Sequence, residues 1–405
     1  MLRLLLYFPS ATFSIIQAEI FPYGVIYALT HSRSLSKNVI PIIFVILLSC
    51  IWGAYNYQIF TVEVFRSIAA YLNAVLVFLL ISNYHTEYLN KIIKINSIIF
   101  YLLIFVGVLQ FTGIFSLVGM GYAIELIMSR GSDGIIGHGR GISLLASEPS
   151  RASYEFLFIY MLFRTTLDQN YQKIFYDCAV SIFILFFIKS ATGALFLVIY
   201  MAVSYRKYIM PLLVLLVIVL FFVGINISLM TDSADTSGYN SRALELMMQS
   251  FSALQDGTLW DLFITASGFR GISVYAAYLS GWSHLFGFGV GMWEQSSVTA
   301  LYESGYHPSD ILYFANRDGV FTSIRPTSFI ASTMLDMGLI GTLVFLYSIR
   351  RFFILHQVDE FRGAFYCFVF YIFFVGSIGN PIPWLIIGAL VAKQKQLFLR
   401  GDVNE

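Results

Sequence analysis

Arginines set in two polar segments are the side chains of this sequence best suited to chemistry. The first segment covers residues 118–146 and holds Arg130 and Arg140, with Arg151 just beyond its end. Five glycines lie between residues 128 and 151. Arginine binds phosphate or carboxylate oxygens through a bidentate fork, and glycine lets backbone amides come close to a ligand. The pattern therefore predicts an anion-binding site.

The second polar segment, residues 227–327, is acidic overall but contains four arginines: Arg242, Arg270, Arg317 and Arg325. Because nine acidic residues accompany them, an anion bound here has to meet particular arginines and not a diffuse basic surface. Apolar spacing predicts amphipathic helices over 241–255 and 271–284. Arg270 then stands at the start of the second helix, where its charge opposes the helix dipole. This placement favours a specific role for Arg270, and Arg325 is a further candidate for substrate binding.

Three side chains are candidates for the base that takes a proton from a reacting hydroxyl. In order of preference they are Glu148, His284 and Asp310. Glu148 directly precedes Pro149 at the start of an apolar stretch, so capping of the next helix is the alternative interpretation. The scattered histidines form no metal motif. The stretch 287–291 lacks the third spaced glycine of a nucleotide loop, and it predicts a tight turn.

Aromatic residues in the long segment are candidates for stacking on sugar rings. Tyr275 and Trp282 share one face of the predicted helix 271–284 and are the preferred pair. Tyrosine and tryptophan also gather at membrane interfaces without any ligand, so an anchoring role is the alternative. The same choice applies to the other aromatic residues of the segment: Trp260, Tyr278, Trp293, Tyr302 and Tyr306.

The composition outside these segments predicts an all-α polytopic membrane protein. Apolar residues make up 58% of the chain, only 12% are charged, and the mean hydropathy is +0.77. Spans of about 20 apolar residues are expected near 38–55, 66–83, 95–117, 147–165, 172–188, 190–204, 209–226, 328–348, 363–379 and 381–392. The first thirty residues add one kinked span or two short ones, predicted as a retained anchor. The prediction is one transmembrane domain over 1–405 with 11 or 12 helices.

The distribution of lysine and arginine predicts the orientation, because basic loops stay in the cytoplasm. Loops rich in basic residues alternate with loops that hold only Arg66 and Lys189. Residues 118–146 and 227–327 then both lie on the outer face, as a first and a large periplasmic loop. The net charge of +1 and the lack of a basic run give no indication of nucleic-acid binding.

Two arginine-to-glycine spacings resemble a motif of the bacterial O-antigen polymerase (Wzy-type) family. Members are described as carrying Arg-x10-Gly in each of two periplasmic loops, and here Arg130 precedes Gly141 while Arg270 precedes Gly281. The stretch 144–150 resembles a Glu-Pro-Ser segment seen in many such polymerases. The stretch 327–341 resembles the span that closes the long loop throughout the O-antigen ligase and polymerase superfamily.

This resemblance implies a GT-C-like membrane glycosyltransferase in the bacterial inner membrane, with its active site facing the periplasm. Its substrate would be an undecaprenyl-diphosphate-linked oligosaccharide, and its partners would be membrane lipids, a chain-length regulator and a flippase. No cofactor and no metal are implied. Arg270, Arg130, Arg140 and Arg151 would stabilise the diphosphate leaving group.

Two other functions stay open. An O-antigen ligase would transfer finished polymer to lipid A core, but Thr327 and Ser328 stand where ligases usually have His-Asn. A lipid-linked oligosaccharide flippase would be expected to carry charged residues within its spans and internal repeats. Only Glu19, Asp177 and Lys189 are candidates for such charges, each near a span end or kink.

Overall fold

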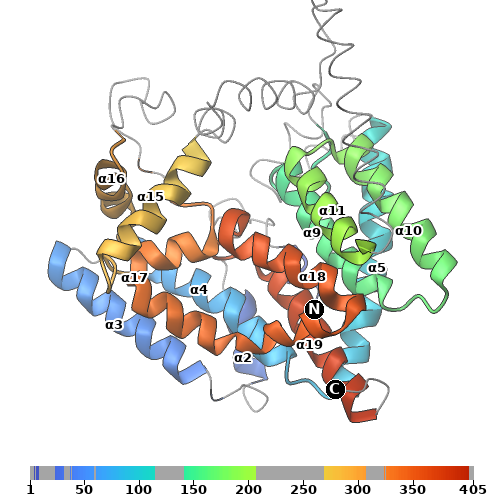
Figure 1. Ribbon diagram of the computed structural model, residues 1–405, viewed down its shortest axis with the longest axis horizontal. Coiled ribbons are helices and arrows are strands. Elements are labelled where there is room, and N and C mark those ends of the chain that lie inside the picture. The colour runs from blue at the N-terminus through green and yellow to red at the C-terminus, as the bar shows by residue number, and fades with distance from the viewer. Residues whose placement is uncertain are drawn as a thin grey trace, which may run out of the picture.

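The computed structural model describes residues 4, 6–8, 23–31, 37, 39–58, 61–114, 141–206, 269–306, 323 and 325–400, and these residues form helices and connecting loops with no strand among them. Figure 1 shows the arrangement. The helices, in chain order, are α2 (Tyr23–Thr30), α3 (Val39–Tyr57), α4 (Val62–Ile81), α5 (Thr86–Phe111), α9 (Pro149–Arg164), α10 (Asn170–Ile182), η3 (Phe183–Ile188), α11 (Ala191–Ser204), α15 (Phe269–Ser283), α16 (Trp293–Glu303), α17 (Phe329–Ser348), η6 (Arg350–Gln357), α18 (Asp359–Phe370), η7 (Tyr371–Val375) and α19 (Pro381–Arg400).

The predicted all-α membrane character is confirmed in its general form. Among the described residues, six helical stretches have the length and apolar composition of a membrane span: α3, α4, α5, α10 with η3, α17 and α19. The windows 147–165, 190–204 and 363–379 are also helical, and so is the predicted amphipathic helix 271–284. The windows 209–226 and 241–255 lie outside the described residues, so the total of 11 or 12 spans stays a prediction. Helix α16 was not predicted.

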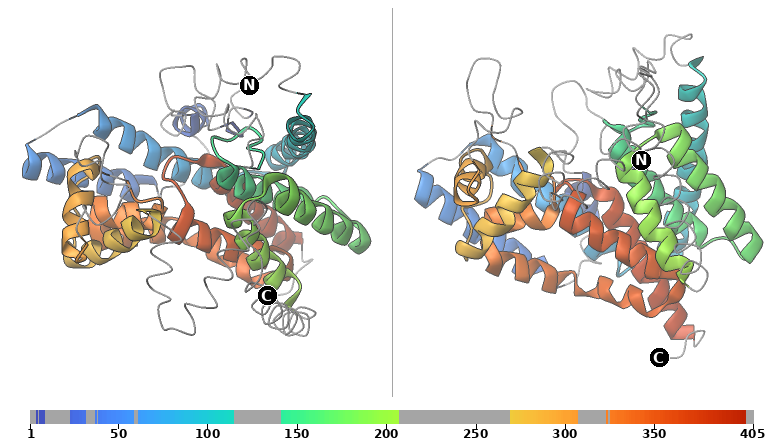
Figure 2. Two further views of the ribbon diagram at one scale, coloured as in Figure 1. Left: turned by 90° about the horizontal axis from the view of Figure 1, so that it is seen from above. Right: turned by 45° about the horizontal axis from the view of Figure 1, so that its top comes forward.

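The helices form two groups that meet on α19. The first group contains α3, α4, α15, α16 and α17, and the second contains α5, α9, α10 and α11 (Figures 1 and 2). Helix α19 packs against α4 of the first group and against α9 and α5 of the second. Its side chains from Trp384 to Ala392 are almost all buried, as expected for a helix that is apolar on every side.

Aromatic rings fill the centre where these helices cross. The ring of Trp384 lies 4.8 Å from that of Phe329 and 5.0 Å from that of Phe368, between centroids. Phe78 adds an edge contact to Trp384 from α4. Such rings bury large apolar areas in fixed geometries, so this cluster fixes α4, α17, α18 and α19 relative to one another.

Helix α17 does not run straight through the window predicted as a span. Gly338 has φ 66° and ψ −168°, a backbone conformation open essentially only to glycine, and it breaks the helix. The two halves fold back side by side: the rings of Phe329 and Phe345 lie 6.0 Å apart, and the hydroxyls of Thr333 and Thr342 lie 3.2 Å apart. In a straight helix the two phenylalanines would be about 24 Å apart. The window is helical as predicted, but its halves form a hairpin.

The glycine-rich stretch 287–291 forms the predicted tight turn and packs against this break. Its glycines at 287, 289 and 291 all have positive φ. A Cβ on Gly289 would lie 2.2 Å from the Cα of Gly53 in α3, so only glycine fits. The amide of Phe288 donates to the carbonyl of Leu335 at 2.9 Å, and that of Gly289 donates to the carbonyl of Asp336 at 2.8 Å. The turn thus satisfies carbonyls that the broken helix leaves open.

Candidate functional site

Glu148, two residues beyond the first predicted outer segment, contacts Arg270 in the second. A guanidinium nitrogen of Arg270 lies 2.9 Å from a carboxylate oxygen of Glu148, across 122 residues of sequence. Glu148 occupies the N-cap position of α9, yet its side chain makes no capping hydrogen bond. Glu148 therefore does not cap α9 through a hydrogen bond, although its charge at this position still complements the helix dipole. Arg270 lies in the first turn of α15, where the apolar pattern placed it.

Arg151 lies within α9, one turn after Glu148, and forms a second ion pair deeper in the protein. Its Nε lies 2.7 Å from a carboxylate oxygen of Glu155. The amide of Asn380, just before α19, donates to the same oxygen at 2.7 Å. The side chains of Arg151 and Glu155 are only 7% and 8% exposed, against 45% for Arg270 and 38% for Glu148. A polar face thus runs from the exposed start of α9 into the bundle.

Helix stability alone does not favour the Arg151–Glu155 pair. A cation in the first turn opposes the helix dipole, and Arg before Glu at a spacing of four is the weaker order. Burial of the two charges also costs free energy that their attraction does not fully offset. Charged residues kept in such a place are candidates for function. Arg151 was predicted as an anion-binding residue, whereas Glu155 and Asn380 were not.

The glycines of the two Arg-x10-Gly spacings serve close packing. A Cβ on Gly141 would lie 1.7 Å from the carbonyl oxygen of Ile188, at the end of η3. A Cβ on Gly281 would lie 2.6 Å from the Cβ of Met334 in α17. Each glycine therefore lets one backbone approach another. Gly281 lets α15, which carries Arg270, pack closely on α17.

His284 lies away from Arg270, at the other end of α15. The two residues are fourteen positions apart, which is about 21 Å along a helix. The Nε2 of His284 lies 2.7 Å from one carboxylate oxygen of Glu303, and Ser280 donates to the other at 2.6 Å. The structure thus brings together the predicted catalytic residues Arg270 and Glu148 but not His284.

Arg325 lies in a separate polar cluster at the hairpin of α17. Its guanidinium lies 3.2 Å from Asp336 and 3.2 Å from the hydroxyl of Ser67. The hydroxyl of Tyr71 donates to the same oxygen of Asp336 at 2.7 Å. Asp336 is 1% exposed, so its charge is balanced within the protein.

Glu155 and Asp336 correct the expectation that charges in the spans are confined to Glu19, Asp177 and Lys189. Both carboxylates lie inside apolar helices, buried and paired with arginines. The signal was present in the sequence, because a carboxylate within an apolar window is rare and marks a site for attention. Asp177 is also buried, within α10, and Glu19 lies outside the described residues.

The two preferred aromatic residues are accessible. Tyr275 is 37% exposed and Trp282 is 65% exposed, on α15. Tyr278 on the same helix is instead tied down, because its hydroxyl donates to the carbonyl of Phe373 at 2.6 Å. Burial raises the pKa of Tyr278 to about 12, so its hydroxyl stays protonated and donating at neutral pH. Tyr275 and Trp282 remain candidates for sugar contact.

Several predicted residues lie outside the part of the chain that the structure describes: Arg130, Arg140 and Asp310. Within the described part, no group of three or more His, Cys, Asp or Glu side chains is placed to hold a metal ion.

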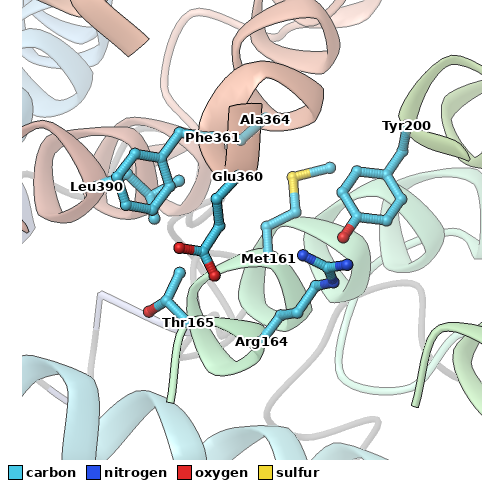
Figure 3. Close-up of a pocket in the computed structure, with 8 residues that line it drawn as sticks. All are labelled: Met161, Arg164, Thr165, Tyr200, Glu360, Phe361, Ala364 and Leu390. Atoms are coloured by element: carbon cyan, nitrogen blue, oxygen red, sulfur yellow. The ribbon is translucent and has the colours of Figure 1, made fainter. Parts of the chain in front are cut away.

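A small pocket at the opposite end of α9 offers no room for a sugar. Arg164, Tyr200 and Glu360 line it together with apolar side chains (Figure 3). Its cavity volume of about 10 Å³ holds about one water molecule. Arg164 is paired at 3.2 Å with buried Asp177, which also accepts a hydrogen bond from Tyr160 at 2.6 Å. This cluster joins α9, α10 and α11.

The start of α9 is therefore the place where the structure gathers groups fit for transfer chemistry. It offers two guanidinium groups for an anion, one accessible carboxylate for a proton, and the exposed ring of Tyr275, five residues after Arg270 on α15. Comparisons with protein families, with curated proteins and with solved structures found no match.

Proposed function

We propose that this protein polymerises undecaprenyl-diphosphate-linked repeat units of O-antigen or a related surface polysaccharide by glycosyl transfer. The observation that carries the proposal is the pairing of Glu148 with Arg270 at 2.9 Å. Arg270 belongs to the second segment predicted on the outer face, and Glu148 follows the end of the first by two residues. They are the residues that the reaction needs, an anion-binding group and a proton acceptor.

The chemistry assigns a role to each group. The bond between C1 of the donor sugar and the diphosphate oxygen breaks, and its electron pair leaves with the lipid diphosphate. Arg270 stabilises the negative charge that develops there, with Arg151 as the deeper guanidinium. An acceptor hydroxyl forms the new bond to C1, and its proton passes to Glu148. The products are the lengthened oligosaccharide and free undecaprenyl diphosphate.

The helical frame supports a membrane-bound reaction. Six long apolar helices among the described residues fit a protein embedded in the bilayer, where a lipid-linked donor is found. The turn 287–291 lies against Val64 at the start of α4, and Arg351 binds Asn83 just after its end. The turn 287–291 and the basic residue Arg351 thus lie at opposite ends of α4, which supports the predicted orientation. In this proposal the fold is GT-C-like, the site faces the periplasm of the inner membrane, and a chain-length regulator and a flippase are partners.

A ligase is the variant of this proposal that differs in its acceptor. The position where ligases usually have asparagine is Ser328, whose hydroxyl accepts from the amide of Ala331 and donates to the carbonyl of Phe373 at 2.7 Å. These bonds cap α17 and tie it to η7. Ser328 is thereby committed to structure, which favours the polymerase.

A lipid-oligosaccharide flippase is the second candidate, and one observation favours it. Transporters use broken membrane helices with charged residues at the break. Helix α17 is broken at Gly338, and Asp336 with Arg325 lies beside the break. Asp336 is buried and Arg325 is only 24% exposed, however, whereas both members of the Glu148–Arg270 pair are accessible, and this difference favours the enzyme.

Surface polysaccharide from a strain that lacks the protein tests the three functions. A polymerase predicts core bearing a single repeat unit, and wild-type protein restores the ladder of long chains on a gel. Bare core contradicts the polymerase. Bare core with long polymer on the lipid carrier identifies a ligase, and bare core with repeat units confined to the cytoplasmic leaflet identifies a flippase.

A further inference from the structure

Among the residues that the structure describes, the polar face of α9 carries two positive and two negative side chains. Two guanidinium groups, Arg270 and Arg151, face two carboxylates, Glu148 and Glu155, in two ion pairs. A diphosphate brings further negative charge, and its oxygens seek the same N–H donors that the carboxylates occupy. A diphosphate at this site therefore competes with the carboxylates for the two guanidinium groups.

The two carboxylates differ in how firmly they are held. Glu155 is buried and accepts hydrogen bonds from both Arg151 and Asn380 at 2.7 Å. Its release would leave buried charges without partners, at a large cost in free energy. Glu148 and Arg270 are 38% and 45% exposed, and an exposed ion pair contributes little stability because water and salt screen it. Glu148 is thus the carboxylate that an incoming anion can replace.

We infer that the donor diphosphate displaces Glu148 from Arg270, and that the released Glu148 is then the base for the acceptor. The inference rests on the proposed function and adds an order of events to it. Before displacement, Glu148 is paired with Arg270. It can therefore accept a proton only after the donor has bound. After displacement, Arg270 holds the diphosphate, and Glu148 takes the proton of the acceptor hydroxyl as the new glycosidic bond forms. Glu155 and Asn380 keep Arg151 in place throughout and act as positioning residues.

Titration of the full-length protein, purified in detergent, with inorganic diphosphate tests the displacement by isothermal calorimetry. Glu148→Gln removes the competing charge, so we expect it to bind diphosphate about two- to five-fold more tightly than wild type. Glu155→Gln disturbs Arg151 and is expected to bind more weakly. Glu294→Gln, an exposed glutamate on α16, is the matched control and is expected to bind like wild type.

A double variant identifies the guanidinium involved. Arg270→Ala is expected to weaken diphosphate binding, and adding Glu148→Gln to it is expected to bring no gain, because the contested partner is gone. Equal melting temperatures of wild type and Glu148→Gln verify that the fold is kept. Unchanged or weaker diphosphate binding by Glu148→Gln overturns the displacement, and so does the absence of diphosphate binding by both proteins.

The role of Glu148 as the base has its own test. Glu148→Gln is expected to bind diphosphate more tightly and yet to lose the polysaccharide ladder in cells, since the amide accepts no proton. Tighter binding with a normal ladder overturns this role. Tighter binding by Glu148→Gln in a protein whose deletion leaves the ladder intact refutes the proposed function but retains the displacement.

Discussion

The start of α9 and the break of α17 each contain an arginine paired with a carboxylate, but the two pairs have opposite surroundings. Arg270 and Glu148 are exposed and come from different helix groups. Asp336 is buried, and Tyr71 and Ser67 join it and Arg325 in one network. An exposed pair contributes little to stability, whereas loss of one partner from a buried pair is costly. We therefore expect the first pair to serve activity and the second to serve the fold.

Of the variants considered, Arg270→Ala should cause the largest loss of activity. Loss of one preorganised donor to developing charge lowers catalytic rates by about 10²–10³-fold. We expect that loss in polymer formation from lipid-linked repeat units by purified protein, with a normal amount of protein in the membrane. Arg66→Ala, which removes an exposed arginine paired with Glu63 on α4, is the control and should leave the rate unchanged. A normal rate for Arg270→Ala would remove Arg270 from the site.

Asp336→Ala should show the largest loss of stability. Removing this carboxylate leaves Arg325 without its buried counter-charge and Tyr71 without its acceptor, which costs about 3–5 kcal/mol. The measurement is the melting temperature in detergent, together with the amount of protein in the membrane. Glu148→Ala is the matched variant of the exposed pair, and we expect it to cost less than about 1 kcal/mol. Equal losses in the two variants would contradict the division of roles.

Gly289→Ala tests whether the turn 287–291 supports the break of α17. The added methyl group would meet the backbone of Gly53, so α3 has to move or the turn has to open. We expect a loss of about 1–3 kcal/mol from overpacking, seen as a lower melting temperature. Gly305→Ala is the control for backbone strain alone, since Gly305 also has positive φ but has no atom within 4 Å of the added Cβ.

Trp282→Ala should have the smallest effect on stability, below about 0.5 kcal/mol, because the side chain is 65% exposed. If Trp282 contacts the sugar, the apparent KM for the lipid-linked substrate rises with little change in kcat. Leu279→Ala, a change of an exposed apolar residue on the same helix, is the comparison. An equal rise in KM for both variants would indicate anchoring of α15 and not sugar contact.

The sequence predicted where many residues lie along helices, but it predicted few of the contacts between helices. The apolar windows placed α3, α4, α5 and α19, and the apolar spacing placed Arg270 at the start of α15. Such patterns are local, so they follow from the period of a helix. The contact between Arg270 and Glu148 spans 122 residues and depends on how two helix groups pack, which no local pattern encodes.

Asp336 was missed for a related reason. Its window reads as one straight apolar span, so the carboxylate looked like part of a closing helix. The hairpin forms because Gly338 adopts a non-helical conformation, which contacts with residues 284–287 hold in place. Asp336 therefore lies at the tip of the hairpin. The aromatic residues show the same limit, since Tyr275 and Tyr278 are alike in sequence, but Tyr275 is exposed and Tyr278 is partly buried in the structure.

The break in α17 also bears on how the chain is assembled during synthesis. The carbonyls of Leu335 and Asp336 accept from the amides of Phe288 and Gly289, which belong to an earlier part of the chain. The ribosome therefore releases the donors before their acceptors. The residues of the turn are thus already synthesised when the open carbonyls of α17 leave the ribosome. A helix broken within an apolar layer would otherwise expose open carbonyls to lipid during insertion.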